Sequence, residues 1–87
     1  GGASSLLAVV EHGGARVFEL TVSPSFVSRQ LKDMGTSEDA IVAAIVRNDR
    51  AIVPRGDDVI QAGDRILIFS TEDASNRVRL YFTPEST

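Results

Sequence analysis

The chain of 87 residues is long enough for one domain but not for two. Hydrophobic residues make up 43% and charged residues 24%, which is typical of a globular domain and excludes a disordered chain. The net charge of −3 disfavours broad binding to nucleic acid or to a membrane surface, and the lack of cysteine excludes disulfides and thiolate chemistry.

The N-terminal part of the chain predicts a β-hairpin. Residues 1–5 are interpreted as a cloning remnant or linker. A short apolar strand is expected over Leu6–Val10, and the paired glycines Gly13 and Gly14 favour a turn. Arg16–Val22 then alternates apolar and polar residues, as a strand with one buried face does.

The segment after this hairpin predicts a short helix that continues through Met34, with Ser25 or Ser28 as the candidate N-cap. Gly35 is suited to end it in a left-handed cap. Apolar residues spaced four and three apart would form its buried stripe: Val27, Leu31 and Met34.

The middle of the chain predicts a second hairpin. Ile41–Val46 is apolar at every position, as expected of a central strand that is covered on both faces. Asn48 and Asp49 form a two-residue loop, because both residue types tolerate the left-handed region. Arg50–Val53 returns antiparallel, and Pro54 marks the strand end.

The C-terminal part predicts a brief extended piece at Val59–Ile60, a turn at Ala62–Asp64 and a last strand at Ile66–Phe69. A final helix follows, with Ser70 and Thr71 as its expected caps. Its buried stripe repeats every four residues: Ala74, Val78 and Phe82. Residues 83–87 are interpreted as a tail.

The predicted order is β-β-α-β-β-β-α, with residues 6–82 forming the domain. Strands mixed with two short helices in so few residues indicate an α+β fold of two layers, with a mostly antiparallel or mixed sheet.

The second hairpin carries the most informative charge pattern. With Asn48 and Asp49 as the loop, Arg47 lies opposite Arg50, and two like charges in that position are mildly destabilising. Either Asp49 and solvent compensate them, or an anion does, since guanidinium groups bind phosphate bidentately. Apolar residues on the same face would supply a floor for a base or ring: Ile45, Ile52 and Pro54.

Catalytic and metal-binding patterns are missing from the sequence. His12 has no companion ligand, and Asp57-Asp58 is interpreted as a solvated loop and not as a cation site. Neither a G-x-S-x-G elbow nor a glycine-rich nucleotide loop is present. We therefore expect a binding module for a small anionic ligand and not an enzyme, without a metal or cofactor of its own.

From Val17 to Phe82 the chain resembles the TrkA-C (RCK-C) family, the C-terminal domain of regulators of potassium conductance. Residues 6–15 are also similar to the segment that precedes this domain in bacterial potassium-uptake proteins of the TrkA type. Ser28 is a departure, because the family often has glycine there. The pieces that carry the resemblance are Phe18–Val22, Ser25–Leu31, Ile41–Asp49, Ile52–Ile60, Ala62–Phe69 and Val78–Phe82.

The resemblance implies a cytoplasmic regulatory domain at the inner face of the membrane, attached to a potassium channel or transporter. It also implies a homodimer, which in some members of the family binds cyclic di-AMP at the dimer interface. NAD would be expected only in an N-terminal Rossmann domain, which this chain lacks. No nucleic-acid partner is expected.

The candidate ligand-binding residues combine the family's hairpin with the charge argument: Ile45, Val46, Arg47, Asn48, Arg50, Ile52, Val53 and Pro54. Two alternatives remain open at this point. One is a purely structural dimerisation module without a ligand. The other is a regulatory domain of a cation/proton antiporter or an anion permease.

Overall fold

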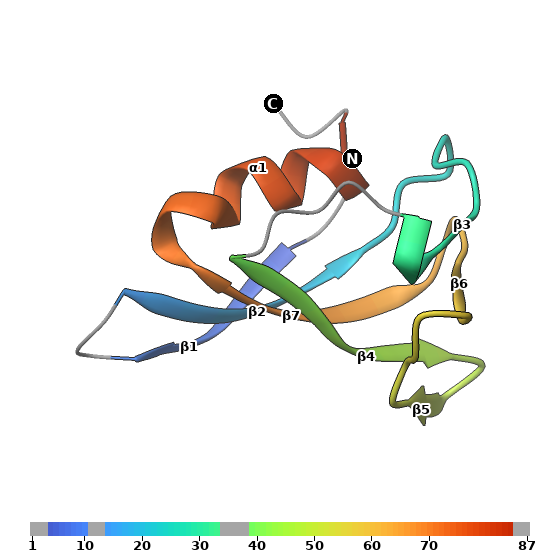
Figure 1. Cartoon of the computed structure of the whole chain (residues 1–87), viewed down its shortest axis with the longest axis horizontal. Coiled ribbons are helices and arrows are strands. Elements are labelled where there is room, and N and C mark those ends of the chain that lie inside the picture. Colours follow the sequence, from blue (N-terminus) through green and yellow to red (C-terminus); the bar gives the residue numbers. More distant parts are fainter. Residues whose placement is uncertain (1–3, 11–13, 34–38, 85–87) are drawn as a thin grey trace.

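The computed structural model describes residues 4–10, 14–33 and 39–84 (Figure 1). Seven strands, one short 3-10 helix (η1) and one α-helix make up this part of the chain. In chain order they are β1 (Ser4–Val10), β2 (Ala15–Thr21), β3 (Arg29–Gln30), η1 (Leu31–Asp33), β4 (Ala40–Arg47), β5 (Arg50–Ile52), β6 (Val59–Ile60), β7 (Arg65–Thr71) and α1 (Glu72–Phe82).

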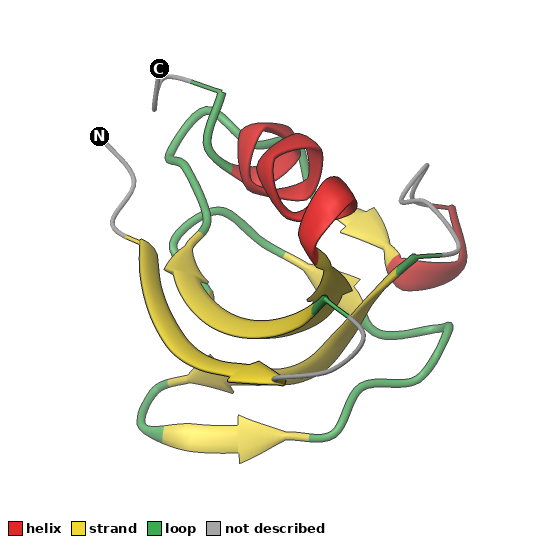
Figure 2. Cartoon of the chain, turned by 90° about the vertical axis from the view of Figure 1, so that its left-hand side faces the viewer, coloured by secondary structure: helices red, strands yellow, loops and turns green. Residues whose placement is uncertain are grey.

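Five strands form the main sheet in the order β1-β2-β7-β4-β5, and β3 pairs with β6 in a separate two-stranded sheet. Every strand pair of the described residues is antiparallel. The main sheet is strongly curved, and α1 lies within the curve (Figure 2). The predicted α+β class is confirmed.

The core lies between the main sheet and α1. Strand β2 turns Phe18 and Leu20 inward, and β7 turns Ile66 and Ile68 inward, because alternate residues of a strand face the same side. Val78 of the helix packs on them. The predicted alternation of β2 is confirmed, and so is the predicted buried stripe of the last helix. The buried apolar residues are Phe18, Leu20, Val22, Ala40, Ile45, Ile60, Ile66, Ile68, Ala74, Val78 and Phe82.

Helix α1 begins directly after β7. The Thr71 hydroxyl accepts a hydrogen bond from the Ala74 N–H at 3.2 Å, which makes Thr71 the N-cap. Glu72 and Asp73 lie in the first turn, where the helix dipole favours negative charge. Ser70, the other candidate cap, is instead a fully buried residue of β7.

The predicted first helix is wrong in the part that the structure describes. Its residues form a loop, strand β3 and the single 3-10 turn η1. Backbone pairing with the segment around β6 overrides the helical pattern, because the Leu31 N–H donates to Asp58 O and the Lys32 N–H to Gly56 O. Met34 and Gly35, its predicted end, lie outside the described residues, as does His12.

The expectation that β4 is covered on both faces is also wrong. Ile41 is 61% exposed, and its cross-strand partner Phe69 is 42% exposed. Both residues lie on the face of the sheet opposite α1, which we call the outer face. The apolar residues of β4 therefore lie on two different faces of the strand: one face packs in the core, and the other is open.

The ends of the domain extend past the predicted limits. Ser4 and Ser5, assigned to the linker, are paired with Leu20 and Glu19 of β2. Thr83, assigned to the tail, is fully buried, and its N–H donates to Arg79 O.

Candidate functional site

The hairpin of β4 and β5 has the predicted turn. Asn48 and Asp49 both adopt positive φ, 52° and 61°, which matches the right-handed twist of a two-residue hairpin. Arg47 is paired with Arg50, and Ile45 with Ile52, as predicted. The like charges therefore lie opposite each other at the tip of the hairpin.

A β-bulge in β4 decides which way Arg47 points. The register between β4 and β7 shifts between Val42 and Ala44, so Ala43 is the extra residue. Because a bulge reverses the alternation, Val42 and Ile45 both face the core, although they are three residues apart. Arg47, two residues after Ile45, shares that face and reaches the edge of the core.

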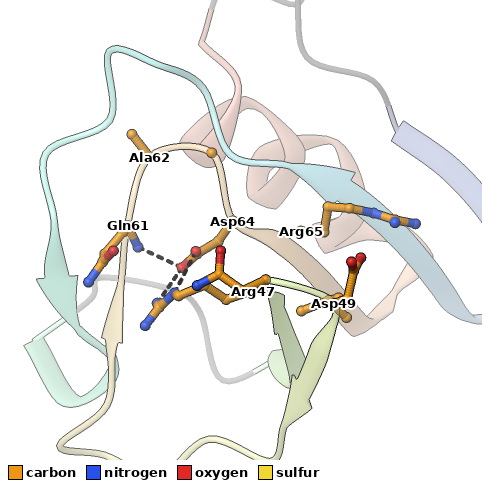
Figure 3. A pocket seen from close by; sticks show the side chains of 9 residues that line it. Arg47, Asp49, Gln61, Ala62, Asp64 and Arg65 are labelled. Carbon is orange, nitrogen blue, oxygen red and sulfur yellow. Dashed lines mark hydrogen bonds and ion pairs between the residues drawn. The ribbon is translucent and has the colours of Figure 1, made fainter.

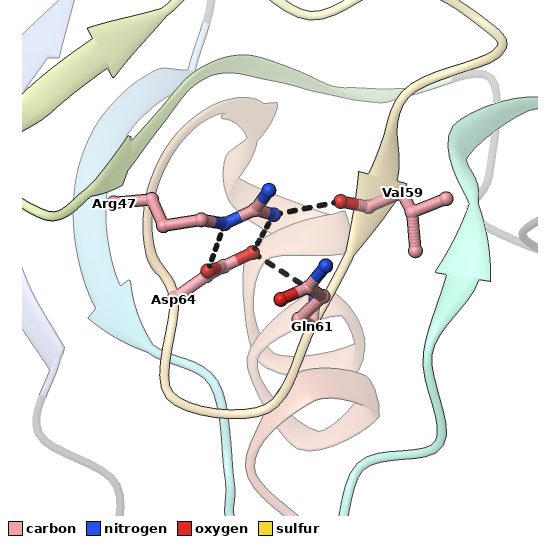
Figure 4. A network of polar contacts seen from close by, with 4 residues as sticks. All are labelled: Arg47, Val59, Gln61 and Asp64. Atoms are coloured by element: carbon pink, nitrogen blue, oxygen red, sulfur yellow. Dashed lines mark hydrogen bonds and ion pairs between the residues drawn. The ribbon is translucent and has the colours of Figure 1, made fainter.

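Arg47 meets a carboxylate there (Figure 4). Its Nε and Nη2 donate to Oδ1 and Oδ2 of Asp64 at 2.8 and 2.6 Å, a bidentate pair. Nη2 also donates to Val59 O at 2.9 Å, and the Gln61 N–H donates to Asp64 Oδ2 at 2.9 Å. This network joins β4 to β6 and to the turn that precedes β7.

Burial makes this pair electrostatically unusual. The Asp64 side chain is only 4% exposed, whereas the Arg47 side chain is 30% exposed. Burial opposes ionisation of Asp64, but hydrogen bonds from Arg47 and the Gln61 backbone outweigh it and hold the pKa of Asp64 below its usual value. The hydrogen bond to Asp64 raises the pKa of Arg47.

An open cavity of about 420 Å³ lies beside this pair, between the β4–β5 turn and the β6–β7 turn (Figure 3). Its walls include Asn48 and Asp49 from one turn and Gln61 to Gly63 from the other. Arg65 lies next to Asp49 (Figure 3). The Nε of Arg65 donates a hydrogen bond to Oε1 of Glu19 at 3.1 Å. That hydrogen bond raises the pKa of Arg65.

The structure divides the predicted site residues into three groups. Val46, Arg47 and Asn48 line the cavity together. Arg50 and Val53 are exposed outside it, and Val53 is 83% exposed. Of the remaining three, Ile45 is 1% exposed and belongs to the core, Ile52 packs against the core, and Pro54 is half-buried. The apolar floor expected from Ile45 is therefore core and not open surface.

Asp64 was missed as a site residue, since the sequence interpretation assigned it to turn architecture. The signal for it depends on the register between the last strand and β4, which the sequence interpretation did not assign. Once the last strand is paired antiparallel with β4, Val46 lies opposite Arg65, which places Asp64 beside Arg47. The compensating charge for Arg47 is thus Asp64, and neither Asp49 nor solvent is needed for that role.

The chemistry available here is recognition of polar or charged groups. Among the described residues, no three His, Cys, Asp or Glu side chains gather where they could hold a metal ion. The described helices include none with the length and apolarity that crossing a bilayer requires. The fold and this site together define a small α+β module built around an ion-paired hairpin.

Comparison with known proteins identifies the family to which this module belongs. The TrkA-C domain model matches residues 16–83, and the chain belongs to the TrkA-C domain family. A Trk system potassium uptake protein TrkA homolog of Archaeoglobus fulgidus is 38% identical over 75 residues, 85% of this chain and 17% of that protein. A Trk system potassium uptake protein TrkA of Azorhizobium caulinodans is 36% identical over 63 residues, 72% of this chain and 14% of that protein. The chain therefore spans less than a fifth of the length of these relatives.

Proposed function

We propose that this chain is the regulatory domain of a Trk-type potassium uptake system, located at the cytoplasmic face of the membrane. The observation that carries the proposal is the TrkA-C match over residues 16–83, joined to relatives that are named Trk potassium uptake proteins. In this role the domain acts as a homodimer that binds a small anionic ligand and passes the change to a membrane transporter.

The outer face of the sheet supports the dimer. Ile41 and Phe69 form an exposed cross-strand pair there, and Val53 adds a third exposed apolar side chain near the hairpin. Large exposed apolar residues in so small a domain are typical of an interaction surface. A second copy of the chain would cover them by a two-fold arrangement.

The hairpin supports the ligand. Arg50 is exposed at its tip, and Arg47 keeps its Nη1 group free of hydrogen bonds to the described residues. In a symmetric dimer both arginines occur twice, which suits a ligand with two phosphates such as cyclic di-AMP. A ligand that spans both subunits would favour one dimer arrangement, and the transporter would follow that population shift.

Titration calorimetry with cyclic di-AMP tests the ligand. The Arg50→Gln variant should lose about tenfold in affinity, since a charge-assisted hydrogen bond to phosphate is removed. Arg77→Gln, at an exposed position of α1, is the matched control and should bind as the parent does. Heat with the same affinity in all three proteins, or no heat at all from a folded dimer, contradicts ligand binding at the hairpin.

Sedimentation velocity tests the dimer. Ile41→Lys and Val53→Lys should shift the protein to monomer, because each places a charge in the proposed interface. Val27→Lys serves as control, since Val27 is 72% exposed but lies in the loop that follows β2, outside strands β4, β5 and β7. A parent protein that is monomeric at high concentration contradicts the dimer.

One observation favours the second candidate, a structural dimerisation module without a ligand. Arg47 is already neutralised by Asp64, which weakens its attraction for an added anion. In that case Ile41→Lys abolishes both the dimer and regulation of transport, whereas Arg50→Gln changes neither.

A further inference from the structure

A smaller cavity of about 220 Å³ lies between the loop that follows β2 and the C-terminal end of α1. It shares no lining residue with the hairpin cavity, so it is a separate site. Its walls are Ser25, Phe26, Val27, Arg29, Tyr81 and Pro84.

The walls of this cavity are already ordered by the fold. The Phe26 ring meets the Tyr81 ring edge-on, with ring centroids 5.9 Å apart, and lies 5.5 Å from the Phe82 ring. The Ser23 N–H donates to Phe82 O at 2.9 Å and the Phe26 N–H to Ser23 O at 3.0 Å, which ties the loop to the helix end. A ligand would therefore meet a preformed site and incur little ordering cost.

Two polar groups of the walls lack partners among the described residues. The Tyr81 hydroxyl is buried and forms no hydrogen bond in the described part of the chain, and such a group destabilises the free protein. Arg29 is exposed and forms no ion pair with the described residues. Arg16, Arg47 and Arg65, by contrast, each hold a carboxylate.

We propose that this cavity binds a small monocarboxylate with an aromatic or branched apolar body of about ten non-hydrogen atoms, the size that its volume admits. The carboxylate pairs with Arg29, because a guanidinium binds it bidentately. The apolar body packs on Phe26, Val27 and the Tyr81 ring. The Tyr81 hydroxyl is covered in the free protein, and a small shift of the side chain would let it donate to an acceptor atom of the ligand, which supplies the hydrogen bond that the free protein lacks.

An NMR titration of the ¹⁵N-labelled chain with sodium phenylacetate tests the proposal. Saturable shifts should be confined to amides of residues 23–30 and 78–84, with a dissociation constant of about 1 mM for a ligand this small. Phenylacetamide, which has the same shape without the charge, should bind about tenfold more weakly. No saturable shifts with either phenylacetate or isovalerate, or equal binding of the amide, overturns the proposal.

One variant and its control test the role of Arg29. Arg29→Gln should weaken phenylacetate about tenfold, whereas Arg55→Gln, an exposed arginine outside both cavities, should leave the affinity unchanged. Equal losses in the two variants would show a general charge effect and overturn the assignment of Arg29.

Tyr81→Phe has opposite effects on stability and on binding. It removes the unpaired hydroxyl, so the free protein should melt no lower than the parent. Its affinity for phenylacetate should nevertheless fall several-fold. A lower melting temperature of the free variant would show that the hydroxyl already has a partner, such as an ordered water, and would overturn its role in binding.

Discussion

Two arginine–carboxylate pairs stand close together in this domain and have very different surroundings. Arg47 and Arg65 lie near each other in the sheet, because Arg65 of β7 is paired with Val46 of β4, the residue that precedes Arg47. Arg47 lies on the core face and holds Asp64, whose side chain is 4% exposed. Arg65 lies on the outer face and holds Glu19, with side chains that are 55% and 30% exposed.

From this contrast we expect burial, and not the pairing itself, to set how much an ion pair contributes to stability. Removing one partner of a buried pair leaves the other partner in a poorly solvated place, whereas water replaces a lost partner at the surface. The same two chemical groups, a guanidinium and a carboxylate, should therefore respond very differently to substitution in the two places.

The largest effect is expected from Asp64→Ala. It removes both hydrogen bonds to Arg47 and the acceptor of the Gln61 N–H, so the free energy of unfolding should fall by about 3 kcal/mol. Urea unfolding followed by circular dichroism measures it. A loss of unfolding free energy no larger than that of Glu19→Gln would contradict the expected difference between the two pairs.

Arg47→Met should have the next largest effect, about 2 kcal/mol, because it keeps the apolar stem but leaves the buried Asp64 carboxylate without its cation. The double variant with Asp64→Ala should be less destabilised than the sum of the two single variants. Simple additivity in this double-mutant cycle would mean that the two side chains act independently.

A smaller effect should appear in the pH dependence of stability. The folded-state pKa of Asp64 is lowered, so its contribution is complete above its unfolded pKa of about 3.9 and is lost as the pH falls through the folded pKa. The stability difference between the parent and Asp64→Asn should therefore shrink between neutral and strongly acidic pH. Other acidic groups are common to both proteins and cancel. A difference that stays constant with pH contradicts the lowered pKa.

The smallest effect is expected from Glu19→Gln on the outer face. The urea midpoint should change little, and any change should vanish at high salt, because exposed charges are screened. A salt-independent loss comparable to that of Asp64→Ala would remove the distinction between the two pairs.

Much of the fold could be predicted from local sequence patterns. The Asn48-Asp49 turn and the Ala74, Val78 and Phe82 stripe depend on residues close together in the chain, and both were predicted correctly. The first helix was not, because its segment is held by backbone pairing to residues more than 20 positions later.

The candidate site was only half predictable for a similar reason. The apolar run Ile41–Val46 gives no sign of the bulge at Ala43, since any alternation fits a stretch that is apolar throughout. Without the bulge, Arg47 would face outward, and its pairing with Asp64 could not be anticipated. The charge on the core face is visible only once the register is known.

The position of β7 in the sheet has a consequence for how the protein is made. Strands β2 and β4 share no ladder with each other, and each is hydrogen-bonded to β7, which comes last among the strands. On the ribosome, the residues before Arg65 can form the β1–β2 and β4–β5 hairpins and the β3–β6 pair, but not the five-stranded sheet. The main sheet can form only after its central strand, Arg65–Thr71, has been synthesised, so the domain folds late in its own synthesis.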